Sequence, residues 1–187
     1  RNMAQTYKIR IKLLRNDKTC NQGLKPGTEW VYDKTPPQGL CNFAFSSLFP
    51  FIEVLKYGGS FPWEPDPNVC TQCCPDHLVN NVFEIRREPE TDKKSESYNV
   101  TVRLVGKECD GVCSFGHREG DTWEFKGPGE LIPGNICPSA LKSIADAVMV
   151  MRYGGQFPWQ SDPDTYTVTC PDPNVRNRFE LKRTPKK

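Results

Sequence analysis

Four residues in the second half of this 187-residue chain carry side chains suited to metal binding or nucleophilic chemistry: Cys113, His117, Cys137 and Cys170. Three thiolates and one imidazole suit tetrahedral zinc and also suit iron. None of the four belongs to a tight Cys-x-x-Cys pair. The set therefore predicts a zinc or iron site only if the fold brings three separate segments together.

The same residues also fit thiol chemistry. Cys137 is followed by Pro138 and an apolar pattern of helical spacing, so its sulfur is expected at the positive end of a helix, which favours the thiolate. His117 would then serve as base or acid, and the turn that holds Phe157 and Trp159 would form a pocket wall. This alternative predicts a thiol-dependent enzyme with Cys137 as nucleophile.

A third interpretation assigns no chemistry to these side chains. Free cysteines are often small buried hydrophobic residues, and His117 would be a surface or hydrogen-bonded loop residue. Further alternatives are a small ligand bound at the Cys/His site without chemistry, and a protein-interaction module that uses exposed aromatic side chains. The sequence leaves these alternatives open.

The chain is an internal duplication. The segment YGGSFPWEPDP at 57–67 returns at 153–163 as YGGQFPWQSDP, with eight of eleven positions identical. Six of the nine cysteines form equivalent pairs, namely Cys20 with Cys113, Cys41 with Cys137, and Cys74 with Cys170. Leu24 stands where the second copy has His117, which predicts a degenerate site in the first copy. We therefore expect a first repeat at 5–87, a charged linker at 88–97 and a second repeat at 98–185.

Each copy predicts the same elements in the same order. Apolar residues alternate over 7–13 and 98–104, as in half-buried strands, and short strands are expected at 30–32 and 123–125. Apolar residues at helical spacing follow over 45–55 and 141–151, and each helix is expected to stop at a Gly-Gly pair. Two further strands end each copy. The prediction is an α+β fold of two tandem β-β-α-β-β repeats, packed as an intramolecular pseudo-dimer around the helices.

Six motifs in order resemble those of an uncharacterised family of small prokaryotic proteins that are one repeat long. They are Cys-x-x-Gly-His at 113–117, Gly-Asp at 120–121, Cys-Pro-x-Ala at 137–140, Gly-Gly-x-Phe-Pro-Trp at 154–159, Asp-Pro at 162–163 and Cys-Pro-Asp-Pro at 170–173. The resemblance extends over both copies. It implies a shared domain without an assigned activity, and the first copy departs from the pattern at Leu24 and Asn42.

The amino-acid composition argues against two classes of partner. Twenty-five Lys and Arg stand against 23 Asp and Glu, a net charge of +2, which argues against a nucleic-acid or anionic-membrane partner. The longest uncharged stretch, 35–52, is interrupted by prolines and polar residues, so no membrane segment is predicted. The odd number of cysteines and the lack of an apolar leader favour a reducing, cytoplasmic location. The expected partners are a metal ion or a small molecule, and a homo-oligomer is left open.

Overall fold

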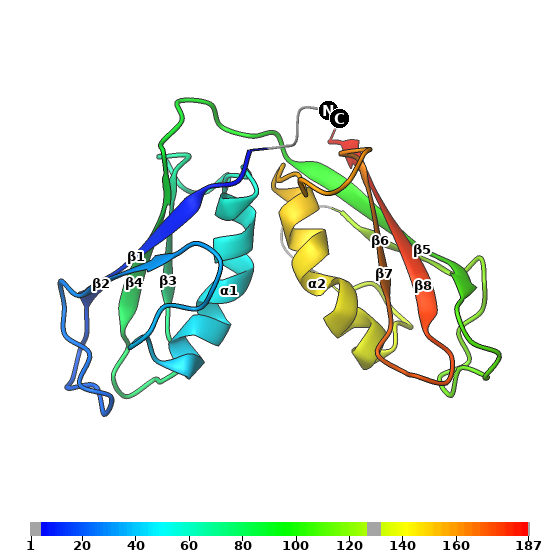
Figure 1. Ribbon diagram of the computed structural model, residues 1–187, viewed down its shortest axis with the longest axis horizontal. Coiled ribbons are helices and arrows are strands. Elements are labelled where there is room, and N and C mark those ends of the chain that lie inside the picture. The colour runs from blue at the N-terminus through cyan, green and yellow to red at the C-terminus, as the bar shows by residue number, and fades with distance from the viewer. Residues whose placement is uncertain (1–4, 127–131, 187) are drawn as a thin grey trace.

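The computed structural model describes residues 5–126 and 132–186, in which the same five elements occur twice (Figure 1). The first half contains β1 (Lys8–Arg15), β2 (Glu29–Tyr32), α1 (Asn42–Lys56), β3 (Val69–Cys73) and β4 (Val82–Glu88). The second half contains β5 (Tyr98–Lys107), β6 (Thr122–Phe125), α2 (Pro138–Arg152), β7 (Thr165–Thr169) and β8 (Asn177–Pro185). The predicted α+β class and the β-β-α-β-β order of both repeats are confirmed.

Each half forms one four-stranded antiparallel sheet, in the order β2-β1-β4-β3 or β6-β5-β8-β7. Ile11 pairs with Trp30 on one side and Ile85 on the other, and Val102 pairs in the same way with Trp123 and Leu181. Side chains alternate between the two faces of a strand, so these matched registers place the apolar set of each sheet on a single face. Both first strands are also irregular near their ends, at 13–15 and 104–106.

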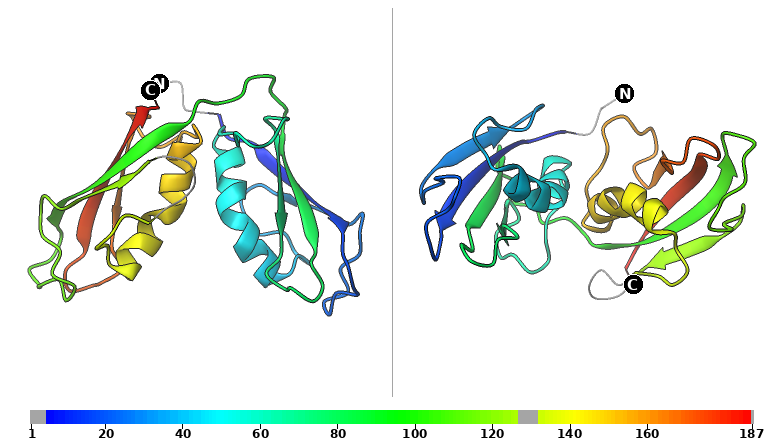
Figure 2. Two further views of the ribbon diagram at one scale, coloured as in Figure 1. Left: turned by 180° about the vertical axis from the view of Figure 1, so that it is seen from behind. Right: turned by 90° about the horizontal axis from the view of Figure 1, so that it is seen from below.

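One helix covers the apolar face of each sheet (Figures 1 and 2). The buried positions recur at helical spacing: Leu48, Ile52 and Leu55 in α1, and Ile144, Val148 and Met151 in α2. Gly58 and Gly154 follow the two helices with φ angles of +82° and +81°, the left-handed conformation that glycine tolerates best. The Gly-Gly stops predicted from sequence are therefore confirmed.

The two halves pack through their helices and the turns that follow them. The Ser60 N–H donates to the Tyr153 carbonyl at 3.0 Å, and the equivalent Gln156 N–H donates to the Tyr57 carbonyl at 2.8 Å. Buried residues of both halves belong to one hydrophobic cluster. The sheets lie outside and the helices inside, so the chain is an intramolecular pseudo-dimer with approximate twofold symmetry (Figure 2).

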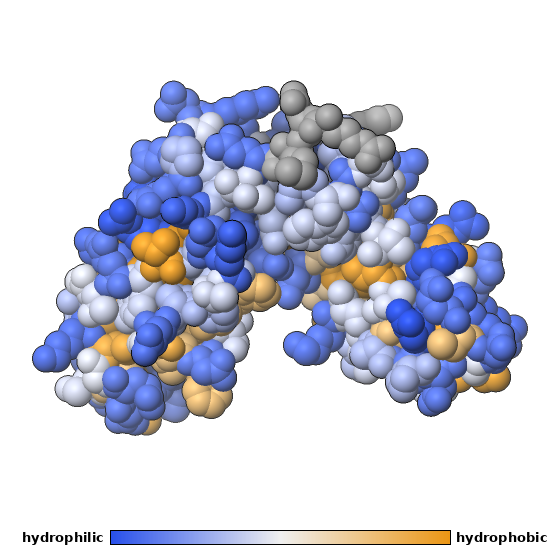
Figure 3. All heavy atoms as spheres, viewed as in Figure 1, coloured by the Kyte–Doolittle hydropathy of each residue, from blue (hydrophilic) through white to orange (hydrophobic). Residues whose placement is uncertain are grey.

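The helices meet near their C-terminal ends, and their N-terminal ends lie at the opposite end of the molecule (Figure 1). The two lobes diverge toward that end (Figure 3). On the face shown, apolar residues reach the surface in small separate groups. No helix among the described residues has both the length and the apolarity needed to cross a membrane. The arrangement leaves the start of each helix, with its cysteine, at the far end of its own lobe.

Candidate functional site

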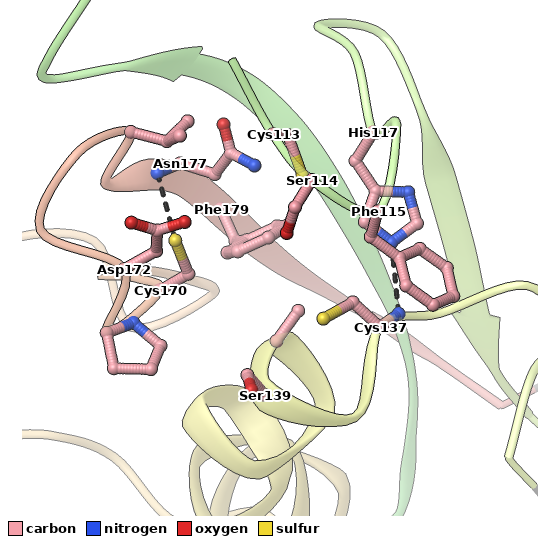
Figure 4. A pocket seen from close by; sticks show the side chains of 13 residues that line it. Cys113, Ser114, Phe115, His117, Cys137, Ser139, Cys170, Asp172, Asn177 and Phe179 are labelled. Atoms are coloured by element: carbon pink, nitrogen blue, oxygen red, sulfur yellow. Dashed lines mark hydrogen bonds between the residues drawn. The ribbon is translucent and has the colours of Figure 1, made fainter. Parts of the chain in front are cut away.

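All four residues selected from the sequence line a single pocket of about 220 Å³ in the second half (Figure 4). Cys113 and His117 come from the loop between β5 and β6, Cys137 precedes α2, and Cys170 directly follows β7. Other lining residues supply an apolar wall or polar edges, among them Ser114, Phe115, Ser139, Ala140, Asp172, Val175, Asn177 and Phe179. Three segments that are distant in sequence therefore converge, as the pattern required.

The start of α2 determines the position of Cys137. This residue is the N-cap, with an extended backbone (φ −60°, ψ 133°), and Pro138 takes the first helical position. The Cys137 side chain makes no capping hydrogen bond to the helix. Its side chain therefore lines the pocket beside the N-terminal end of the helix.

His117 holds the start of the helix in place. Its Nε2 accepts a hydrogen bond from the Cys137 backbone N–H at 3.0 Å, and its Nδ1 lies 3.4 Å from Oδ2 of Asp121. An imidazole that accepts at Nε2 in its neutral form carries its proton on Nδ1, on the side of the carboxylate. The ring packs between Phe115 and Trp123, each with its centroid 4.9 Å away. In this arrangement Nε2 is engaged with the backbone and not with the Cys137 thiol.

The other two cysteines are fixed by their turns. The Cys113 carbonyl accepts the Gly116 N–H at 2.9 Å, and Gly116 has a φ of +87°, which explains the glycine of the Cys-x-x-Gly-His motif. Cys170 and Asn177 are joined twice, through the Cys170 N–H to the Asn177 carbonyl at 2.8 Å and the Asn177 N–H to the Cys170 sulfur at 3.2 Å. Backbone geometry thus sets the positions from which both side chains enter the pocket.

The four side chains surround the pocket without meeting at one point. All nine cysteines of the chain are free. Within residues 5–126 and 132–186, no group of three or more His, Cys, Asp or Glu side chains lies close enough together to hold a metal ion. A ligand shared by the three thiols would therefore have to draw them inward or span the space between them.

Phe157 and Trp159 lie elsewhere and do not line this pocket. They follow the C-terminal end of α2 and pack on Tyr57 of the first half, with ring centroids 5.1 and 5.5 Å away. A helix of 15 residues is about 22 Å long at 1.5 Å per residue, so a turn at one end is remote from a pocket at the other. These rings belong to the contact between the halves.

The Cys-x-x-Cys string of the first half forms no metal-binding turn. Cys70 and Cys73 lie within the extended strand β3, where Cys70 is fully buried and Cys73 is exposed. Burial raises the pKa of the Cys70 thiol to about 12, which disfavours the thiolate that metals and electrophiles require. His77 is an exposed loop residue, as expected from its position after Cys74.

Sequence reasoning missed Asn177, although it lines the pocket and bonds to Cys170. The repeat contained a signal for it, because the first half has Asn81 at the equivalent position before its own closing strand residues. An asparagine retained in both copies next to a retained cysteine indicates that the two residues act together.

Comparison with known proteins returns no match: no family model, no curated protein and no solved structure is similar to this chain. The resemblance based on the six motifs stays a prediction, and the site must be interpreted from its own geometry.

Proposed function

We propose that the second half binds a thiophilic metal ion, zinc or iron, through the thiolates of Cys113, Cys137 and Cys170. The observation that carries the proposal is the convergence of three cysteines from a loop, a helix start and a strand end on one pocket (Figure 4). Thiolate sulfur is a preferred donor for both metals. When bound, such an ion would supply Lewis acidity or redox chemistry at this pocket.

The electrostatic surroundings support a cationic ligand. No lysine or arginine occurs among the described residues that line the pocket, whereas Asp172 adds a carboxylate. Three thiolates in one pocket repel each other unless a positive charge lies between them. The N-terminus of α2 and the Asn177 N–H stabilise individual sulfurs, but a cation would stabilise all three together.

Metal binding would require the sulfurs to turn inward, because the pocket is much larger than a single ion. A cysteine side chain changes direction by rotating about one torsion, χ1, so this adjustment needs no change of fold. Water or a small exogenous ligand would then occupy the remaining coordination position. His117 serves in this proposal as a positioning residue that holds the Cys137 backbone.

The hydrogen bond at His117 favours metal binding over the alternative of a thiol-dependent enzyme. A general base has to reach the proton that it removes, and Nε2 of His117 already accepts the Cys137 N–H. Metal coordination by thiolates needs no such base once the ion itself favours deprotonation.

The test is to measure metal binding to untagged, fully reduced protein. Elemental analysis of the purified chain is expected to find zinc or iron, and Co²⁺ added to the metal-free chain is expected to give sulfur-to-cobalt charge-transfer absorption. Cys137→Ser should lower the bound metal by one equivalent per chain. Cys109→Ser is the matched control, because Cys109 lies in the same half but outside the pocket.

The proposal fails if the reduced wild-type chain is free of zinc and iron and shows no cobalt–sulfur absorption. It also fails if Cys137→Ser and Cys109→Ser bind the same amount of metal as the wild type. Far-ultraviolet circular dichroism of each variant would show that the helices are retained.

A further inference from the structure

The first half contains its own pocket at the equivalent place, lined by Cys20, Cys41 and Cys74 and with a volume of about 350 Å³. Each thiol is carried by the same kind of element as its counterpart: the loop between the first two strands, the residue before the helix, and the residue after the third strand. The three-cysteine arrangement is therefore complete in both halves, although only the second half has the histidine.

The local backbone geometry around these cysteines repeats closely. Cys41 is the N-cap of α1 with φ −61° and ψ 133°, and its side chain makes no capping hydrogen bond. The Cys20 carbonyl accepts the Gly23 N–H at 2.8 Å, and the Cys74 N–H donates to the Asn81 carbonyl at 2.9 Å. The replacement of histidine by Leu24 has left the placement of all three thiols intact.

Cys20 is surrounded by hydrogen-bond donors. Asn81 Nδ2 donates to its sulfur at 3.4 Å. The backbone of Gln22 and that of Leu24 also lie within hydrogen-bonding reach of this sulfur. Donors directed at a cysteine sulfur are the environment in which a thiolate is stable.

Asn81 also places a buried side-chain oxygen without a hydrogen-bond partner at this pocket. Its side chain is 3% exposed and lines the pocket, and its Oδ1 accepts no hydrogen bond from any described residue. Buried polar oxygens almost always have a partner, so an oxygen without one next to a cysteine indicates that a ligand supplies it. A cation, or a group bound to it, would satisfy this oxygen.

We infer that the first half is a second thiophilic metal site, in which Cys20, Cys41 and Cys74 provide sulfur and Asn81 Oδ1 provides an oxygen donor. The inference depends on the metal-binding chemistry proposed for the second half. It adds a second ion per chain, bound without any histidine, in the copy that the sequence marks as degenerate.

The stoichiometry of Cd²⁺ binding tests the inference. Native mass spectrometry of the reduced, full-length chain is expected to show two Cd²⁺ ions per chain. Cys20→Ser and its counterpart Cys113→Ser should each bind one, and the double variant none. Cys73→Ser is the control, because that thiol is exposed on β3 and lies outside both pockets.

Alkylation of the wild type provides a measurement that does not depend on a variant folding. Cd²⁺ should protect Cys20, Cys41 and Cys74 from N-ethylmaleimide, with the modified positions identified by peptide mass mapping. Asn81→Leu should weaken Cd²⁺ binding by the first half about tenfold and leave the second half unchanged.

The outcomes separate the two proposals. One Cd²⁺ per chain with protection confined to Cys113, Cys137 and Cys170 would overturn the inference and leave the proposed function standing. One ion with protection confined to the first-half thiols would support the inference and overturn the proposal for the second half. No bound Cd²⁺ would overturn both.

Discussion

The two thiol pockets differ in what surrounds a shared set of cysteines. The second pocket has His117 and the overlying Phe115, whereas the first has Leu24 and Gln22 at those positions. Phe115 packs on His117, and the second pocket is the smaller of the two, about 220 Å³ against 350 Å³. Backbone turns and helix starts therefore set the positions of the thiols, while the aromatic and imidazole side chains adjust the size of the pocket and the access to it.

At the contact between the halves, the two helices differ in their acidic residues. Glu53 of α1 corresponds to Met149 of α2, and Asp146 of α2 corresponds to Pro50 of α1. Glu53 and Asp146 interact electrostatically across the helix contact. The hydrogen bonds of the turns have stayed symmetrical, whereas the acidic groups at the helix contact have not.

A buried arginine supports the Gly-Gly turn in each half, with a different partner. Nε of Arg87 donates to Asn68 Oδ1 at 3.0 Å, and Nε of Arg183 donates to Asp164 Oδ1 at 2.8 Å. Both guanidinium groups also donate to a glycine carbonyl of the turn, at 2.9 and 2.7 Å. Arg87 therefore lies among neutral acceptors, whereas Arg183 faces a carboxylate that is 55% exposed.

Replacing these arginines should give the largest loss of stability. Arg87→Met should lower the free energy of unfolding by about 3 kcal/mol, because it leaves several buried acceptors without a donor. Arg183→Met should cost less, about 2 kcal/mol, because water can solvate Asp164. Arg10→Met, at an exposed ion pair, should cost the least of the three. Urea denaturation measures all three, and equal losses for Arg87 and Arg183 would contradict the assigned difference.

Alanine at the second glycine of each turn should disturb the halves unequally. A Cβ at Gly59 would lie 2.6 Å from the Tyr153 carbonyl of the other half, whereas a Cβ at Gly155 would lie 3.4 Å from the equivalent Tyr57 carbonyl. Both would crowd the preceding helix. Gly59→Ala should therefore destabilise the protein by about 2 kcal/mol and Gly155→Ala by about 1 kcal/mol. Thermal unfolding followed by circular dichroism measures both, and the reverse order would contradict this account of the interface.

Glu53 should make stability depend on pH. Burial and the nearby Asp146 raise the pKa of Glu53 from 4.5 to about 7, against a smaller opposing effect of Lys56. The folded chain therefore holds a proton that the unfolded chain releases between these values, so stability should fall as pH rises from about 4.5 to about 7 and then level off. The loss should be about 1–2 kcal/mol, which allows for solvent screening of this half-buried side chain.

The variant Glu53→Met, which copies the second helix, isolates this effect. Other groups titrate over the same range, so the relevant quantity is the difference in unfolding free energy between the variant and the wild type at each pH. That difference should grow in favour of the variant up to about pH 7. Parallel stability curves for the two proteins would refute the role of Glu53.

The fold could be predicted because its signals are local and occur twice. Alternating apolar residues, apolar residues at helical spacing and the Gly-Gly pair appear in both copies. The same pattern in one copy therefore supports the element predicted in the other. The third strand of the second half, β7, ends at Thr169, and Cys170 begins the turn that follows it. The pseudo-dimer could be expected from the thin core of a single repeat.

The site was only partly predictable. The repeat indicated which residues line the pocket. No pattern of side chains predicts that the backbone N–H of Cys137 donates a hydrogen bond to Nε2 of His117. Helix α2 separates Trp159 from Cys137 by its full length, a distance that the motifs themselves do not contain. The lack of a hydrogen-bond partner for Oδ1 of Asn81 results from its burial and its neighbours, which the sequence does not reveal.

Exchanging the residues that distinguish the two pockets should change stability only slightly, and it tests the comparison between the pockets most directly. His117→Leu removes the acceptor of the Cys137 N–H at the helix start and should cost about 1 kcal/mol. If His117 positions Cys137 and is not a ligand, the variant should still bind Cd²⁺ in the second half, with affinity lowered about tenfold. Loss of that ion from His117→Leu, with the helices retained, would instead make the imidazole a ligand. The reverse change, Leu24→His, should raise neither affinity nor stability, because Thr28 stands where the second half has Asp121 to hold the ring.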